Sequence, residues 1–280
     1  MTPTEKTNVA AFFDLADDYL SGGYKRLHKE LAFSGDTPPP SLEPQRDIKP
    51  ASKIQNTEKP PAPQAEKKPN AGDSLNTVAA DIASCTRCGL CSTRTNTVPG
   101  EGVTQPLVMV IGEGPGEDED RLGRPFVGRA GQLLDRMLDS KGRIGLSRNT
   151  NCYIANVLKC RPPGNRNPQP DEISACIPYL TRQITLLRPK IILAAGNTAA
   201  KALLGSTDGI TRLRGIVTVF RGTLLMDGDF NIPLLPTFHP SALLRDESLK
   251  APVWEDMKTL RKKLCELDGA FAERMAAIPI

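Results

Sequence analysis

The chain has 280 residues, of which 39% are hydrophobic, 24% charged and only 5% aromatic, and its formal net charge is +4. This length suits one or two domains with a sizeable core, and a mildly basic charge is compatible with a polyanionic partner without identifying one. Seven cysteines are too few for a disulfide scaffold, and no apolar run reaches the ~18 residues of a membrane span, so a secreted mini-domain and a membrane protein are excluded. We expect a cytoplasmic protein of a bacterium.

The beginning of the chain predicts a short helical segment over residues 1–35, followed by a linker. Apolar side chains recur at helical spacing at Val9, Phe12, Phe13, Ala16 and Leu20. This helix either packs on the main domain or docks a partner protein, and acidic residues within its apolar run argue against a secretory signal. Residues 36–73 hold nine prolines among Lys, Glu, Gln and Ser, a composition that predicts a disordered linker.

From residue 74 to residue 280, short apolar runs alternate with helical patterns. The predicted strands are 106–111, 152–158, 190–195, 216–226 and 232–238, and the predicted helices are 129–140, 171–187, 196–204 and 251–267. Buried strands alternating with helices predict an α/β fold, a three-layer α/β/α sandwich around a mostly parallel sheet. Ligands of such sheets bind beyond the C-terminal ends of the strands, where this chain has polar loops.

The cysteines are spaced as in a metal site. Cys85 and Cys88 form a C-x2-C pair with Cys91 three residues later, and Cys160 and Cys176 follow far downstream. Two distant cysteines can complete a four-sulfur set, and the absence of a second C-x2-C pair favours an iron–sulfur cluster over zinc. The spacing leaves the role of Cys91 open. Cys152, in a strand, and Cys265, in a helix, are expected to pack as small hydrophobic residues.

The first loop at the strand ends, Gly112–Asp120, is rich in glycine but has five acidic residues. It matches neither dinucleotide nor P-loop motifs, and its charge would repel a phosphate. It can instead bring backbone amides and one carboxylate close to a neutral planar ligand. Phe126 follows in a loop bounded by glycine and proline, where a core role and a stacking role are both open.

The second and third loops add polar side chains. Asn156 lies near the end of the second predicted strand, just before the basic stretch 159–166. His239 opens the third loop, His239–Arg245, and is one of only two histidines. An asparagine and a histidine at strand ends are often structural, but here both lie where a site would form.

These elements together resemble the family 4, or thermophile-type, uracil-DNA glycosylases. The resemblance rests on Gly112–Asp120 with Arg124–Val127, Asn156 with Lys159–Pro163, His239-Pro240-Ser241, and four cysteines. It covers roughly residues 75–265 and leaves the first 73 residues outside. Each motif is weak alone, but the ordered set is specific.

The resemblance implies hydrolysis of the N-glycosidic bond of uracil in DNA, which initiates base excision repair. The target base must be flipped out of the duplex. Phe126 would stack on uracil, Asn156 would accept from N3–H and donate to O4, and the backbone of Gly112, Glu113 and Gly114 would lie near O2. His239 would stabilise the leaving anion, and Glu113 would orient water or stabilise the sugar cation. Better known uracil glycosylases have a water-activating Asp where this chain has Gly114, so the resemblance does not identify a general base.

The resemblance also implies a structural 4Fe–4S cluster and a DNA-binding surface. The cluster ligands would be Cys85, Cys88, Cys160 and Cys176. Leu243 would be the wedge that fills the gap left by the flipped base. The remaining DNA contacts would come from Lys159, Arg161, Arg166, Ser241 and Arg245. We expect a monomer whose partner is uracil-containing DNA, with a protein as a second partner in the case where the helix in residues 1–35 docks rather than packs on the main domain.

Two other functions are compatible with these motifs. One is a non-catalytic or self-crosslinking uracil-DNA binder, but the basic insertion typical of such a relative is missing after Asp120. The other is an electron-transfer or nucleotide-binding module, and the acidic first loop argues against nucleotide phosphates. Release of free uracil, as opposed to a persistent protein–DNA adduct, distinguishes a glycosylase from the first alternative.

Overall fold

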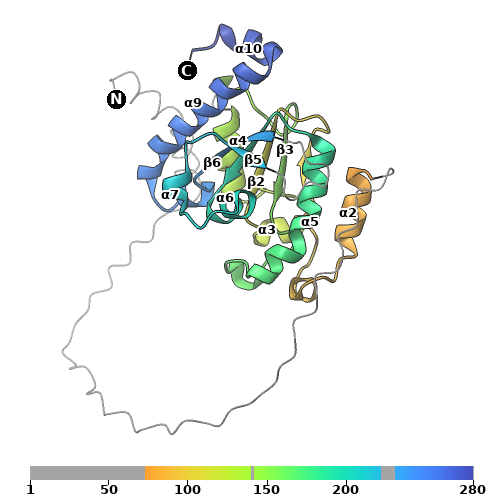
Figure 1. Ribbon diagram of the computed structural model, residues 1–280. Coiled ribbons are helices and arrows are strands. Elements are labelled where there is room, and N and C mark those ends of the chain that lie inside the picture. Colours follow the sequence, from red (N-terminus) through yellow and green to blue (C-terminus); the bar gives the residue numbers. More distant parts are fainter. Residues whose placement is uncertain (1–72, 140–141, 222–230, 280) are drawn as a thin grey trace, which may run out of the picture.

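The computed structural model describes residues 73–139, 142–221 and 231–279 (Figure 1). The predicted helical segment 1–35 and nearly all of the predicted linker lie outside these residues, as does the end of the predicted strand 216–226.

The described chain forms one mixed sheet of six strands. Their bounds are β1 Glu101–Gly102, β2 Val108–Gly112, β3 Cys152–Asn156, β4 Ile191–Ala195, β5 Thr218–Arg221 and β6 Asn231–Thr237. The spatial order is β1-β3-β2-β4-β6-β5, with the four central strands parallel and the two edge strands antiparallel to their neighbours. The predicted α/β fold with a mostly parallel sheet is confirmed.

The helices connect the strands and extend the C-terminal end. Their bounds are α2 Leu75–Ala83, α3 Glu117–Leu122, α4 Arg129–Asp139, α5 Pro170–Leu187, α6 Asn197–Leu204, α7 Ile210–Leu213, α8 Pro240–Leu243, α9 Lys250–Leu267 and α10 Gly269–Ala276, with 3-10 turns at Gly89–Ser92, Pro163–Asn165 and Glu247–Leu249. In the described part of the chain, no helix has both the length and the apolar character needed to cross a membrane.

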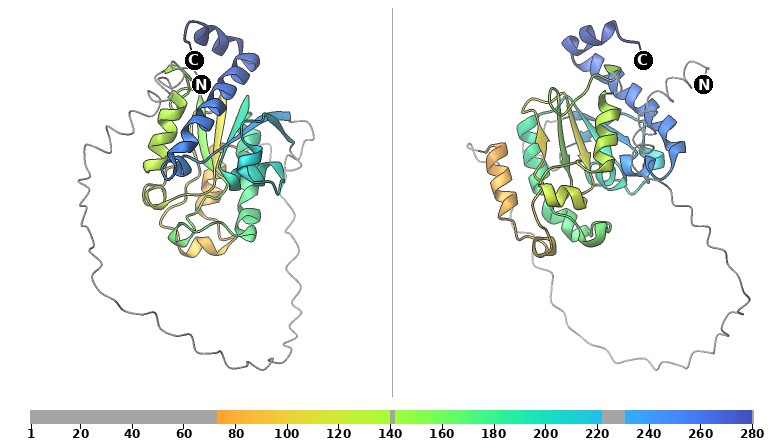
Figure 2. Two further views of the ribbon diagram at one scale, coloured as in Figure 1. Left: turned by 90° about the vertical axis from the view of Figure 1, so that its left-hand side faces the viewer. Right: turned by 180° about the vertical axis from the view of Figure 1, so that it is seen from behind.

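Two apolar clusters pack against opposite faces of the sheet. Val108 and Val110 face a cluster built from α4 and α9, whereas Met109 and Ile111 face a cluster built from α5 and α6. Alternate residues of a strand point to opposite faces, so a strand buried on both sides is apolar throughout, as β2 is. Figure 2 shows helices on both sides of the sheet, which gives the predicted three layers.

A third, smaller cluster joins α2 to α5 beside the cysteine-containing turn. Arg182 on α5 fixes this contact because its guanidinium donates to Asp73 at 2.7 and 2.8 Å and to Asp81 at 2.6 Å. Asp73 therefore belongs to the folded unit, one residue before the predicted boundary at residue 74.

Candidate functional site

The C-terminal ends of the parallel strands bring three of the predicted loops together. Gly112 at the end of β2 pairs with Asn156 at the end of β3. On the other side of β2, Gly196 after β4 donates its N–H to Thr237 O at the end of β6, at 2.9 Å. His239 lies two residues beyond Thr237, so the strand pairing itself places it at the same edge as Asn156.

Asn156 carries the most informative polar atom of this edge. Its side chain is 2% exposed, and its Oδ1 is the single buried side-chain oxygen or nitrogen in the described residues that has no hydrogen-bond partner. A buried acceptor without a donor costs roughly 1–3 kcal/mol, so such an atom calls for an explanation. An added methyl group on Gly112 would lie 2.5 Å from this oxygen, so Gly112 is needed for the close approach. Asn156 thus offers a buried acceptor to a ligand that brings its own N–H.

The Phe126 ring lies at the same point. A methyl group on Gly112 would also lie 2.5 Å from Cζ of this ring. The ring centroid is 5.5 Å from that of His239, with the two planes tilted by 34°. Phe126 has a φ of +52°, a left-handed conformation that non-glycine residues rarely adopt. Phe126, Asn156 and His239, predicted from three separate loops, are brought together.

His239 is held in one tautomer. The backbone N–H of Ser241 donates to His239 Nδ1 at 3.2 Å, and Ser241 Oγ lies 2.8 Å from the same nitrogen. Because Nδ1 accepts a hydrogen bond, the proton of the neutral ring is on Nε2. Burial, together with the positive charge of Arg245, lowers the pKa of His239 to about 4. The ring is therefore neutral at pH 7 and can donate from Nε2.

Glu113 follows Gly112 and has a partner that the sequence did not reveal. Thr198, in the first turn of α6, donates from Oγ1 to Glu113 Oε2 at 2.5 Å. This bond fixes one carboxylate oxygen and leaves the other available. Gly114 lies against Leu158, because a Cβ added to Gly114 would be 3.4 Å from the Cβ of Leu158. Thr198 could have been suggested by its place at the end of β4, the one central strand end for which no site residue was predicted.

The prediction that Lys159 contacts DNA is wrong. Its side chain is 1% exposed, and its ammonium donates to the backbone O of Asn156 at 2.8 Å and to Gln183 Oε1 at 2.7 Å. Burial lowers the pKa of Lys159 to about 8. A side chain so enclosed cannot reach a phosphate. It instead braces Asn156 from inside the protein.

The other predicted DNA contacts lie at or near the surface. Arg245 is exposed, whereas Arg161 is partly buried and donates to Asn165 Oδ1 at 2.8 Å. Arg166 is exposed but forms two bonds, of 2.6 and 2.9 Å, with the buried carboxylate of Glu172. Arg166 thus fixes a carboxylate in the first turn of α5.

The proposed wedge also needs correction. Leu243 is 1% exposed and belongs to the main apolar cluster, so it cannot enter a duplex without leaving the core. Its neighbour Leu244, at the end of α8, is 39% exposed. The sequence did not predict the helical turn of α8. Because of this turn, Leu244 faces outward and Leu243 faces the core.

The four predicted cluster ligands line one cavity. Cys85, Cys88, Cys160 and Cys176 surround it together with Cys91. Cys85 and Cys88 come from the turn after α2, Cys160 from the loop after β3, and Cys176 from α5. Cys152 and Cys265 lie elsewhere, packed in or against the main apolar cluster as expected.

N–H groups point at three of these four sulfurs. Cys85 Sγ accepts from the backbone N–H of Arg87 at 3.5 Å, and Cys176 Sγ accepts from that of Lys159 at 3.3 Å. Cys160 Sγ accepts from the Arg94 guanidinium at 3.3 Å, a partner that the sequence did not suggest. Such donors are typical around metal-bound thiolates, which are stronger acceptors than thiols. Burial raises the pKa of Cys176 to about 11, so a thiolate there requires a compensating cation.

The cysteine sulfurs around the cavity do not form a site for a single metal ion. Among the described residues, no three of His, Cys, Asp and Glu converge closely enough to hold a single ion. A tetrahedral zinc would draw four sulfurs to ~2.3 Å from one centre, whereas each thiolate of a four-iron cluster binds a different iron. The positions of the sulfurs do not select one of these two groups.

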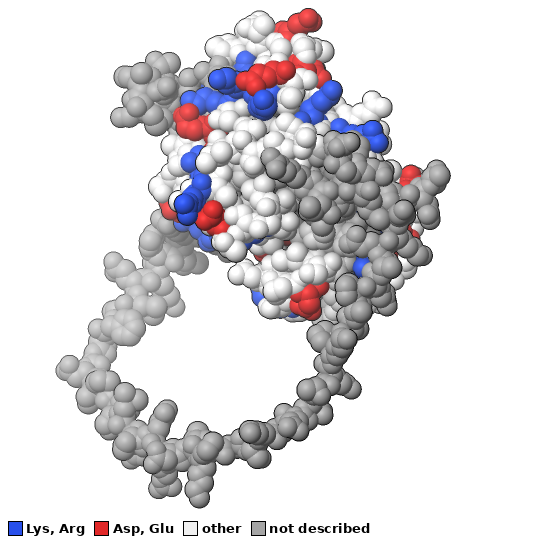
Figure 3. Space-filling view, in the orientation of Figure 1, with Lys and Arg blue, Asp and Glu red and all other residues white. Residues whose placement is uncertain are grey.

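Charged side chains of both signs mix on the face shown in Figure 3. Along α9, Lys258 pairs with Glu255 and Lys263 with Glu266, each at 2.8 Å. These partly buried lysines are thus accompanied by acids. The exposed Arg245, by contrast, lies close enough to His239 for its charge to lower the pKa of that ring.

The comparisons with known proteins agree on one family. The sequence profile of the uracil DNA glycosylase superfamily matches residues 99–258. Type-4 uracil-DNA glycosylases of Sulfurisphaera tokodaii, Thermotoga maritima and Archaeoglobus fulgidus are 43%, 42% and 40% identical to this chain. The matched regions cover 68%, 66% and 70% of the chain and 84%, 91% and 94% of the respective relatives.

Proposed function

The chain belongs to the uracil DNA glycosylase superfamily and is a uracil-DNA glycosylase, and on this basis we propose a role in the reaction for each residue of the site. The observation that carries the proposal is the unpartnered, buried Oδ1 of Asn156 beside Gly112, Phe126 and His239. DNA bases are inaccessible in the duplex, so the uracil must first be flipped out of the stack into this site.

Asn156 distinguishes uracil from cytosine. Its Oδ1 accepts from the N3–H of uracil, and its Nδ2 donates to O4. Cytosine has no N3–H and carries an amino group in place of O4, so it would leave both atoms of the amide mismatched. A site built around such a pair rejects the wrong base because buried polar groups would lose their partners. The hydrogen bond from Lys159 Nζ to the backbone O of Asn156 holds that peptide group in place.

His239 and Glu113 stabilise the charges that develop as the glycosidic bond breaks. Negative charge grows on the uracil, and the neutral ring of His239 donates from Nε2 to O2. Positive charge grows on the sugar, and the Glu113 carboxylate either stabilises it or orients the attacking water. Because Gly114 has no side chain to act as a base, Glu113, fixed by Thr198, is the acidic group that we assign to this step.

The surface around His239 binds the DNA. We assign the wedge to Leu244, since it is the exposed apolar side chain next to the buried Leu243. Arg245, Arg161, Arg166 and Ser241 are proposed to contact flanking phosphates, which position the strand without specifying its sequence. Lys159 is not part of this set.

We further propose a structural 4Fe–4S cluster held by Cys85, Cys88, Cys160 and Cys176. These four cysteines would hold the cluster, and through it they would connect the turn after α2, the loop after β3 and α5. The loop after β3 also contains Arg161, so the cluster stabilises part of the DNA-binding surface. Cys91 lines the same cavity as a fifth thiol. The seven unpaired cysteines agree with the proposed cytoplasmic location, and a monomer is proposed as the active form.

The reaction is tested with a single-stranded oligonucleotide that contains one uracil. After incubation, alkali cleaves the strand at any abasic site, and a denaturing gel reports the position. We expect cleavage at the uracil alone, with release of free uracil. An intact strand after incubation with the folded protein would indicate a non-catalytic binder, and a slowly migrating adduct that survives denaturation would indicate self-crosslinking.

A further inference from the structure

We propose that Arg148 and Glu119 are positioning residues that hold the Phe126 ring in its base-stacking position. This inference rests on the proposed stacking role of Phe126. The backbone of Phe126 is left-handed, with φ at +52°. Such a conformation persists only where the surroundings hold it. The bonds that hold this segment end on the peptide groups immediately before and after Phe126.

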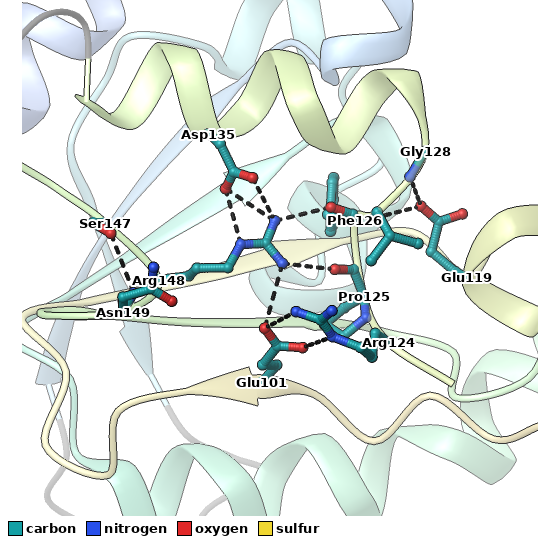
Figure 4. Close-up of polar contacts among 11 residues, drawn as sticks. Glu101, Glu119, Arg124, Pro125, Phe126, Gly128, Asp135, Ser147, Arg148 and Asn149 are labelled. Atoms are coloured by element: carbon teal, nitrogen blue, oxygen red, sulfur yellow. Dashed lines mark hydrogen bonds and ion pairs between the residues drawn. The ribbon is translucent and has the colours of Figure 1, made fainter. Parts of the chain in front are cut away.

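Arg148 binds two backbone carbonyl oxygens of this loop. Its Nη1 donates to Pro125 O at 3.1 Å and its Nη2 donates to Phe126 O at 2.9 Å. Figure 4 shows the guanidinium pointing into the loop with both carbonyls turned toward it. The Arg148 side chain is only 10% exposed, so these bonds are largely protected from water.

Two carboxylates anchor Arg148 to regular elements. Asp135 on α4 accepts from Nε at 2.9 Å and from Nη2 at 3.0 Å. Glu101 on β1 lies 3.8 Å from Nη1 and is itself bound by Arg124 at 2.6 and 2.8 Å. The position of the loop is thereby tied to a helix and to the edge of the sheet (Figure 4).

Glu119 on α3 binds the backbone N–H groups that follow Phe126. Its Oε1 accepts from the N–H groups of Val127 at 2.8 Å and Gly128 at 2.9 Å, and its Oε2 accepts from Gly116 N–H at 3.1 Å. Gly131 completes the arrangement, since a methyl group there would overlap Phe126 O at 1.9 Å. The loop is therefore held on both sides of Phe126 and lies directly on α4.

These contacts assign Arg148 and Glu119 to the geometry of the site and not to its chemistry. Their hydrogen bonds go to the protein backbone and to the carboxylate that anchors Arg148, so substitutions should change the rate of excision more than the affinity for DNA. Misplacement by about 1 Å can slow a reaction by ~100-fold. We expect Arg148→Met and Glu119→Ala to slow single-turnover excision by ~10–100-fold, with less than ~3-fold change in the Kd for uracil-containing DNA.

The decisive test is a double-mutant comparison with Phe126→Ala. If Arg148 and Glu119 act through the ring, Arg148→Met or Glu119→Ala should slow excision by less than ~3-fold when Phe126 is already alanine. The reason is that substitutions of residues that act through one another have non-additive effects. An equal loss in both backgrounds would overturn the positioning role and leave the glycosylase function intact. An unchanged rate for Phe126→Ala alone would instead remove the proposed stacking role.

Arg261→Met is the matched control. Arg261 is also a buried arginine whose guanidinium donates to backbone carbonyls, those of Arg143, Met275 and Ile278. It joins α9 to α10, away from the Phe126 loop. We expect Arg261→Met to lower the melting temperature while it leaves single-turnover excision within ~2-fold. If Arg261→Met slows excision as much as Arg148→Met at equal loss of stability, the positioning role is contradicted. If Arg148→Met does not fold, Glu119→Ala decides by the same criteria.

Discussion

His239 makes a prediction at the scale of a single residue. Its imidazole is expected to stay neutral well below pH 6.5, because burial and the charge of Arg245 lower its pKa to about 4. The chain has two histidines, so a His28→Gln variant leaves one imidazole signal in an NMR titration. This signal should remain constant from pH 8 to 5 and shift near pH 4.

The sign of the effect on stability follows from the same pKa. The unfolded imidazole binds a proton below pH ~6.5, whereas the folded one does not until about pH 4. The free energy of unfolding should therefore decrease as the pH falls from ~6.5 toward 4, and His239→Asn should lessen that decrease. A titration midpoint near 6.5 in the folded protein would contradict the assignment of a neutral donor.

Leu243 and Leu244 are adjacent but should respond oppositely to substitution. Leu243→Ala should lower the free energy of unfolding by ~2–5 kcal/mol because it leaves a cavity in the core. Leu244→Ala should leave stability within ~0.5 kcal/mol and slow excision from duplex DNA more than from single strands, since only a duplex needs the gap filled. Urea unfolding and single-turnover rates measure the two effects. If Leu243→Ala instead loses excision of uracil from duplex DNA while its stability is unchanged, Leu243 is the wedge.

At the scale of elements, the cysteine cavity predicts which thiols carry the cluster. Cys160→Ser should remove the broad visible absorbance and much of the iron, which in the wild-type protein should approach ~4 atoms per chain. Cys265→Ser is the control, because this thiol packs against the main apolar cluster and its loss should leave the colour unchanged.

Cys91→Ser separates the remaining alternatives for this site. If the four proposed ligands are correct, the variant keeps its absorbance and iron content. Loss of iron in Cys91→Ser with retention in one of the other four variants would reassign the ligand set. A colourless wild-type protein with stoichiometric zinc would overturn the cluster.

The elements also differ in how far the sequence could predict them. The strands β2, β3 and β4 follow from continuous apolar runs, and Asn156 and His239 follow from their places at strand ends. Helix α3 was not predicted because its sequence, EDEDRL, has one apolar residue and no periodicity. It forms because four acidic residues in its first turn interact favourably with the helix dipole.

The errors at Lys159 and Leu243 share a physical cause. Composition indicates that lysines are exposed, but it cannot show that Gln183, on α5, provides a partner for a buried ammonium. Likewise, spacing from His239 identifies a leucine, but only the turn of α8 determines which of two leucines points outward. Thr198 and Arg148 were missed because their roles depend on contacts between distant segments, and Glu119 was missed because its bonds depend on how the loop after α3 folds back.

At the scale of the whole molecule, net charge distinguishes the N-terminal region from the rest of the chain. Residues 74–280 carry 26 basic and 21 acidic side chains, whereas residues 1–73 have a net charge of −1. Deletion of residues 1–72 should leave the excision rate on short oligonucleotides within ~2-fold, because DNA affinity depends on phosphate contacts made by basic side chains. A large loss of rate would make this region part of the catalytic unit.

The boundary itself can be checked with a second truncation. Deletion of residues 1–73 also removes Asp73, which binds Arg182 through two hydrogen bonds. This shorter protein should unfold at lower urea concentration than the 1–72 deletion, since removing one partner of a partly buried ion pair leaves the other charge without it. Equal midpoints would place the start of the folded unit after Asp73.

The central claim is that Asn156 reads the base, and one measurement tests it most directly. Single-turnover rates are compared for wild-type protein and Asn156→Asp on two oligonucleotides that differ only in uracil or cytosine at one position. The wild-type protein should act on uracil alone, and Asn156→Asp should lose ~10–100-fold of its rate on uracil, because the carboxylate cannot donate to O4 and a buried unpaired group costs ~1–3 kcal/mol. An Asn156→Asp protein that excises uracil at the wild-type rate and still rejects cytosine would contradict the claim.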